Sequence, residues 1–199
     1  MAEIKAFNRW SVEGIQVHDE GLKEHMTITP RIVPRSGARF SKFKFHKTKT
    51  FVIERLMNKI MIPGHKAKKH KISSYTATGK SLTAYKLTEQ TLEIIEKQTK
   101  HNPIKVVVEA IENAAPREEI ISIEYGGARY PKAVECAPQR RIDVALRHMT
   151  QGAFGKSFNS KRKYVDCLAE EIINAWQKSS ASHAISKKLE LERQADASR

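Results

Sequence analysis

The side chains best suited to catalysis in this 199-residue chain are Glu135, Asp143 and His148, which lie close together in the sequence. Carboxylates beside an imidazole can hold a metal ion and cleave a phosphodiester. Asp143, however, stands four residues before Arg147 on an expected helix, which is ordinary spacing for an ion pair. The glycines Gly126 and Gly127 do not have the spacing of a phosphate-binding loop. We therefore expect no enzymatic activity and no catalytic residue.

The histidines and cysteines of the sequence do not have the spacing of a metal site. His65 and His70 have no cysteine or carboxylate companion nearby, and Cys136 and Cys167 are the only cysteines. Two widely separated thiols provide neither a zinc ligand set nor a disulfide framework. We expect reduced structural thiols, no metal and no cofactor.

The charge balance points to a polyanionic partner. The chain has 36 Lys+Arg against 22 Asp+Glu, a formal net charge of +14, and such an excess is self-repulsive until an anion neutralises it. A membrane surface is an alternative, but no apolar run approaches the roughly 20 residues that span a bilayer. The N-terminal residues also lack an apolar signal core. We expect nucleic acid as the partner, no membrane and a cytoplasmic location.

Cationic residues occur in several separate segments. They comprise Arg31, Arg35, Arg39, Lys42, Lys44, Lys47 and Lys49 in the first segment, Lys66, Lys68, Lys69 and Lys71 in a loop, Arg129, Arg140 and Arg141 farther on, and finally Lys156, Lys161, Arg162 and Lys163. Charge on several loops fits a protein that contacts several strands of folded RNA, whereas a duplex binder concentrates its contacts on one surface. A basic DNA-binding architectural protein remains the alternative.

Aromatic residues are interleaved with the first cationic segment. Phe40, Phe43 and Phe45 alternate with lysines, a composition that suits stacking on exposed RNA bases beside bound phosphates. For the phenylalanines alone, we favour the simpler interpretation that they fill the core.

A β-ribbon and a basic helix position the central cations. Apolar residues alternate with polar ones on both sides of Gly126-Gly127, which predicts an antiparallel β-ribbon at about 119–137. Pro138 then opens a helix that we expect to end near Gly152.

Helical periodicity and capping residues predict five further helices. We expect them at about 49–61, at 81–99, at 103–115 with Asn102 as N-cap, from Ser160 to about Lys178, and after Ser182. In this interpretation Lys161, Arg162 and Lys163 lie in the first turn of a helix, where cations favour a bound anion. Residues 1–49 form an N-terminal extension with a basic arm, and 50–199 form one helical domain.

Several motifs in fixed order resemble the universal small-subunit ribosomal protein seven family, in its archaeal and eukaryotic style. They are NKIM, GKSLTAYKLTEQTLEIIEKQT, NPIKVVVEAIENAAPREE and GGARYPKAVECAPQRRIDVALRHMTQGA. The resemblance covers roughly Phe51 to the C-terminus. It implies a mainly α fold: a bundle of about six helices with a protruding two-stranded antiparallel β-ribbon, preceded here by the basic N-terminal extension.

The resemblance also implies a function. Such a protein binds the 3′ major domain of small-subunit ribosomal RNA, nucleates assembly of the head, and lies near the decoding centre, the exit-site tRNA, the mRNA and neighbouring head proteins. The family's functional positions carry over to Lys80, Arg117, Arg129, Arg140 and Arg141 as ribosomal RNA contacts, and to Gly126, Gly127, Ala128, Arg129 and Tyr130 as the ribbon tip facing tRNA and mRNA. The N-terminal extension and the insertion HKAKKHKISSYTAT depart from the bacterial pattern, so their cations are assigned to RNA on charge alone.

Overall fold

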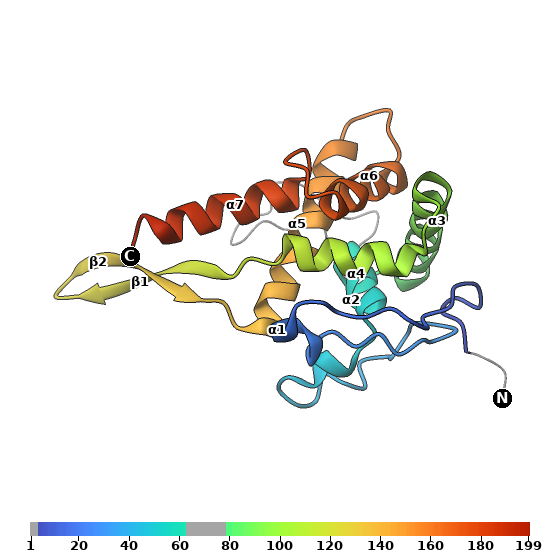
Figure 1. Ribbon diagram of the computed structural model, residues 1–199, viewed down its shortest axis with the longest axis horizontal. Coiled ribbons are helices and arrows are strands. Elements are labelled where there is room, and N and C mark those ends of the chain that lie inside the picture. Colours follow the sequence, from blue (N-terminus) through green and yellow to red (C-terminus); the bar gives the residue numbers. More distant parts are fainter. Residues whose placement is uncertain (1–3, 63–78) are drawn as a thin grey trace.

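A helical body with one projecting β-ribbon makes up the fold of the computed structural model, which describes residues 4–62 and 79–199 (Figure 1). Its elements are α1 (Glu20–Lys23), the 3₁₀ helix η1 (His46–Lys49), α2 (Val52–Ile60), α3 (Ser81–Thr99), α4 (Pro103–Ala114), β1 (Glu118–Tyr125), β2 (Ala128–Glu135), α5 (Pro138–Ser157), α6 (Tyr164–Trp176) and α7 (His183–Asp196). The expected mainly α fold with a two-stranded antiparallel ribbon is confirmed.

Helix α6 lies at the centre of the body. It packs against α3, α4 and α5, and its residues Leu168 and Ile172 are completely buried. The connection from α3 to α4 is short, as the sequence indicated, because the Asn102 side chain accepts a hydrogen bond from the Ile104 N–H at 3.0 Å and Pro103 occupies the first turn. Despite this short connection, the two helices pack on α6 more extensively than on each other.

Two helix boundaries differ from the expected ones. Helix α5 continues past Gly152 to Ser157, and Gly152 marks a close approach, since a Cβ there would lie 2.6 Å from the Cβ of His183 at the start of α7. Helix α6 begins at Tyr164 with Lys163 as its N-cap, so Ser160 does not cap it. The expectation that three cations occupy its first turn is wrong. An acid, Asp166, lies in that turn, as the helix dipole favours.

The N-terminal segment is mostly irregular, as expected, but it contributes to the core. Phe7, Trp10, Leu22 and Met26 are buried in the same hydrophobic cluster as the helices. The Trp10 indole N–H also donates to Glu96 on α3 at 3.0 Å. Burial of these side chains anchors the segment to the body, while the proposed division at residue 49 stays a prediction.

Helix α7 extends outward from the body, and its C-terminal end lies beside the ribbon (Figure 1). Its buried residues are Ala184, Ile185 and Ala195, and Ser182 caps it by accepting from the Ile185 N–H, as the sequence predicted. None of the helices within the described ranges is both long and apolar enough to cross a membrane.

Candidate nucleic-acid interface

The outer part of the β-ribbon makes no contribution to the core. Its strands pair from Glu118–Glu135 to Tyr125–Ala128, and every residue from 121 to 132 is exposed. Gly126 and Gly127 adopt positive φ angles of 58° and 83°, which the tight turn requires. A ribbon with no buried face in its outer half is available to contact another molecule.

Tyrosine and arginine side chains surround the ribbon tip. Tyr125 is 81% exposed and Tyr130 is 59% exposed, while the Arg129 guanidinium lies 3.6 Å from Glu124 on the opposite strand, with both side chains largely in solvent. Such an exposed pair contributes little to stability. The tip residues predicted from the sequence, Gly126 to Tyr130, are therefore brought together at the end of the ribbon.

Ion pairs secure the root of the ribbon. Arg140 at the start of α5 donates to Glu119 on β1 at 2.5 Å, and this hydrogen bond raises the pKa of Arg140. The C-terminal Arg199 donates to both oxygens of Glu118, at 2.5 and 2.7 Å. The Arg117 side chain is exposed beside this root. Arg140 of α5 and Arg199, which follows α7, therefore hold the base of the ribbon.

Arg141 is directed into the protein, unlike its neighbour Arg140. Its residue exposure is 9%, its Nε donates to the carbonyl of Pro116 at 3.0 Å, and its NH2 donates to Asp19 at 2.6 Å. Burial, the largest single influence, would raise the pKa of Asp19, but the hydrogen bond and charge of Arg141, together with the Gly21 N–H, outweigh it and the pKa is lowered. An RNA contact by Arg141 stays a prediction, and the bonds within the fold already use its guanidinium.

The cations of residues 31–49 form a largely unpaired basic surface. Lys47 bonds to Asp143, whereas no other cation of this segment forms an ion pair within the described parts of the chain; these are Arg31, Arg35, Arg39, Lys42, Lys44 and Lys49. Two of the cations lie over aromatic rings instead, Arg31 over Phe40 at 5.8 Å and Lys42 over Phe43 at 5.5 Å. The segment thus presents positive charge and aromatic rings together.

Phe43 and Phe45 do not fill the core. They are 59% and 70% exposed, and Phe40 is half-buried, so the core interpretation of these phenylalanines is wrong. Phe45 lies at the start of η1 with a φ of 65°, in the left-handed region. Exposed aromatic rings among cations are groups on which unpaired bases can stack.

The remaining predicted cations lie apart from this segment. Lys80 is exposed at the start of α3, and Lys161 and Lys163 are exposed before α6. Arg162 bonds to Glu170, and Lys156 donates to the buried Glu171 at 3.1 Å. Lys66, Lys68, Lys69 and Lys71 lie outside the described residues, as do His65 and His70.

No group of three or more potential metal ligands occurs within the described ranges. Asp143, which the sequence suggested would pair with Arg147, bonds instead to Lys47 and to Arg55, the latter at 3.2 Å. Both cysteines are free and buried, and burial, assisted by Glu119, raises the pKa of Cys136 to about 11. These thiols are structural groups rather than nucleophiles.

Two functional candidates on α2 escaped the sequence analysis. Glu54 and Arg55 are each 3% exposed, although charged residues are rarely buried so deeply without partners. Their adjacent position inside an otherwise apolar stretch, VIERLM, was the available signal. The N-terminal segment covers these two side chains, since Glu54 accepts hydrogen bonds from Ser36 and Arg55 donates to the carbonyl of His25.

The family model and the similar proteins that match this chain agree with one another. The model of a family described as ribosomal protein S7p/S5e matches residues 22–199. The small ribosomal subunit protein uS7 of Nanoarchaeum equitans is 52% identical over 197 residues, 99% of this chain and 100% of that protein. The protein of the same description from Archaeoglobus fulgidus is 42% identical over 197 residues, 99% of this chain and 96% of that protein.

Proposed function

The chain belongs to the ribosomal protein S7p/S5e family, and from that premise we propose that it binds the 3′ major domain of small-subunit ribosomal RNA and nucleates assembly of the head. As a family member it is a structural, non-enzymatic component of the small ribosomal subunit. In the proposed role its ribbon tip lies at the subunit interface, near the decoding centre, the exit-site tRNA and the mRNA, with other head proteins as neighbours.

The observation that carries this proposal is the exposed ribbon on a fixed root. Twelve consecutive residues, 121–132, are exposed, including Ile121, Ile123 and Tyr125. Apolar and aromatic side chains held away from the body are unfavourable in water, and contact with a partner would cover them. The ion pairs of Arg140 and Arg199 at the root hold the ribbon in a defined direction.

The distribution of cations supports folded RNA over duplex DNA. The basic surface of residues 31–49, the exposed lysines before α6 and the Arg117 region belong to different parts of the chain. RNA strands that pass several sides of one protein can neutralise such separate groups together. We assign the remaining exposed sequence-predicted cations to the same role. Lys66, Lys68, Lys69 and Lys71, which lie outside the described residues, are assigned to it on charge alone.

An RNA footprint tests the proposal. The full-length chain is bound to protein-free small-subunit ribosomal RNA, and chemical protection is mapped along the whole molecule. We expect protection confined to the 3′ major domain. Protection spread evenly over the RNA, or concentrated in another domain, contradicts the proposal.

Competition at matched salt separates RNA from DNA binding. We expect log affinity for the 3′ major domain to fall with log salt by about 0.7 to 0.9 for each phosphate neutralised. Random duplex DNA should compete weakly at every salt concentration. Equal affinity for duplex DNA restores the architectural DNA-binding alternative.

A further inference from the structure

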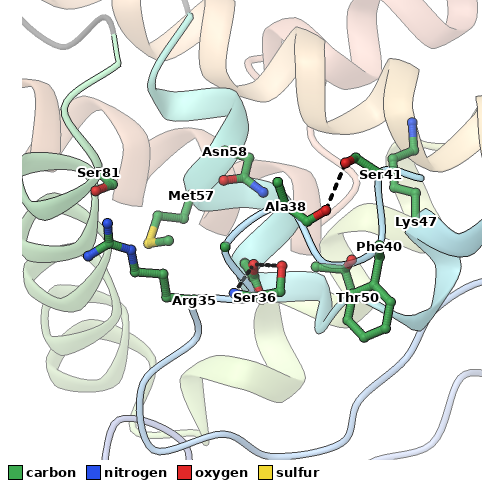
Figure 2. Close-up of a pocket in the computed structure, with 12 residues that line it drawn as sticks. Arg35, Ser36, Ala38, Phe40, Ser41, Lys47, Thr50, Met57, Asn58 and Ser81 are labelled. Atoms are coloured by element: carbon green, nitrogen blue, oxygen red, sulfur yellow. Dashed lines mark hydrogen bonds between the residues drawn. The ribbon is translucent and has the colours of Figure 1, made fainter.

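A pocket of about 300 Å³ lies between residues 35–41 and α2 (Figure 2). Ser36, Ala38 and Ser41 belong to one side of its lining. Met57 and Asn58 of α2 and Ser81 at the start of α3 also line it. The volume is at the lower end of the range for small-ligand sites. The pocket is therefore the size of a single small planar group rather than of an extended ligand.

The pocket contains a buried carboxylate with an unused oxygen. Glu54 is 3% exposed, and its Oε1 accepts from the Ser36 N–H at 2.7 Å and from the Ser36 hydroxyl at 2.5 Å. Its Oε2 is buried and accepts no hydrogen bond from any described residue. A buried acceptor without a donor is unfavourable, and a ligand that brings N–H groups would correct it.

The nearby cations do not supply that donor. Lys47 lines the pocket but bonds to Asp143 on α5. Arg35 extends along the edge of the pocket beside Met57 in Figure 2 and forms no ion pair with the described residues. Arg35 is exposed, so it is placed to meet an anion outside the pocket, whereas Glu54 belongs to the buried part of the lining.

Apolar surface and neutral polar groups complete the lining. Phe40 and Met57 provide surface on which a flat ring can lie, and Asn58 provides an amide that both donates and accepts. A phosphate inside the pocket would be repelled by Glu54. The combination of an interior acceptor and an exterior cation fits a nucleobase whose phosphate remains outside.

We propose that this pocket receives one unpaired guanine of the bound RNA, with its Watson–Crick edge donating to Glu54. Guanine presents two adjacent donors, N1–H and N2–H, to an acceptor that can only accept. Adenine and cytosine place a ring-nitrogen acceptor beside their amino group, and uracil flanks its one donor with two carbonyl oxygens, so Glu54 repels part of each edge. This assignment rests on the proposed RNA-binding function and adds base selectivity to it.

Short RNAs with one variable base test the selectivity. The full-length, isotope-labelled chain is titrated with UUGUU, with the same pentamer carrying inosine, adenosine or cytidine at the centre, and with UUUUU. We expect UUGUU to bind at least five-fold more tightly than UUUUU and to shift the amide resonance of Ser36, whose N–H bonds to Glu54. Inosine lacks the N2 donor and should bind with intermediate affinity. Equal affinities for all five, or no shift at Ser36, overturn the proposal.

Variants separate the pocket from general RNA affinity. Glu54→Gln replaces an acceptor oxygen with an amide donor, and we expect it to abolish the preference for guanine while UUUUU binding is unchanged. Glu190→Gln is the control, since Glu190 is an exposed carboxylate on α7 that bonds to Lys187, and it should keep the preference. If Glu54→Gln does not fold, the guanine-to-inosine comparison in the natural chain decides the question.

Two further outcomes are informative. Guanosine triphosphate that binds more tightly than UUGUU makes this a free-nucleotide site and overturns the assignment to an RNA base. Salt-dependent binding to the 3′ major domain together with no guanine preference overturns only the pocket assignment, whereas absence of binding to that RNA domain contradicts the proposed function itself.

Discussion

Asp143 on α5 accepts a hydrogen bond from Arg55 on α2, with 3.2 Å between Oδ1 and NH2 and only 3% of the Arg55 side chain exposed. The same guanidinium donates to the carbonyl of His25 at 3.0 Å. One carboxylate thus joins two helices, the N-terminal segment and, through Lys47, the basic surface. A buried cation held in this way depends strongly on its partner.

Loss of the Asp143 carboxylate should destabilise the fold. We expect Asp143→Asn to lower the free energy of unfolding by about 3 kcal/mol, because Arg55 would remain buried without its counter-charge. Asp196→Asn is the control, since that side chain is 68% exposed. Urea denaturation measures both, and a loss below about 1 kcal/mol for Asp143→Asn would show that Arg55 does not require the pair.

Protonation of the Asp143 carboxylate should destabilise the fold at low pH. Burial tends to raise the pKa of Asp143, but the hydrogen bond from Lys47 and the charge of Arg55 outweigh burial, so the pKa is lowered. Its stabilisation is complete above the unfolded-state pKa of about 3.9 and is lost as pH falls through the lower folded value. Denaturation at several pH values should show this loss below about pH 4 in the natural chain. The loss should be smaller in Asp143→Asn, where Asp19 still contributes.

The buried side chain of His148 should cause a second loss of stability, at higher pH than the loss caused by Asp143. Burial, and then the charge of His183, lower the pKa of His148 to about 4. The unfolded chain binds the proton more readily, so stability falls as pH drops from about 6.5 to 4, at up to about 1.4 kcal/mol per pH unit. His148→Gln should flatten this slope, whereas the exposed control His18→Gln should retain it. An unchanged slope in His148→Gln assigns the effect to another group.

Substitution of the two adjacent arginines of α5 should lower the free energy of unfolding by different amounts. Arg141→Met breaks a buried pair with Asp19 and should cost about 2 kcal/mol of unfolding free energy. Arg140→Met removes a more exposed pair with Glu119 and should cost less than about 1 kcal/mol. Thermal unfolding and RNA binding are measured for both. An Arg141→Met chain of natural stability with weakened RNA binding would make Arg141 an RNA contact, as the family resemblance implied.

A substitution at the ribbon tip should weaken tRNA binding without changing the stability of the fold. Arg129→Ala removes a largely exposed side chain, so we expect the free energy of unfolding to change by less than about 0.5 kcal/mol. Exit-site tRNA binding by reconstituted small subunits should decrease. Lys105→Ala removes an exposed cation of α4 as the control, and equal losses of tRNA binding in both variants would indicate a general charge effect.

The sequence predicted the elements whose signals are local. Asn102 before Pro103, Ser182 before α7 and the two glycines of the ribbon each bond to or adopt a conformation of their own immediate backbone, so their consequences do not depend on distant residues. The end of α5 was missed because Gly152 normally weakens a helix, and only the approach of His183 shows why a glycine is required there.

The sequence by itself determined the helical periodicity, the ribbon, the excess of positive charge and, through its motifs, the family. The tertiary structure alone decided which charges remain available, since Arg141 and Arg55 are oriented inward by Asp19 and Asp143, residues 122 and 88 positions away. It also placed Phe43 and Phe45 in solvent and Glu54 in a pocket. The physical reason is that burial and ion pairing depend on neighbours brought together by folding, whereas periodicity and capping depend on neighbours along the chain.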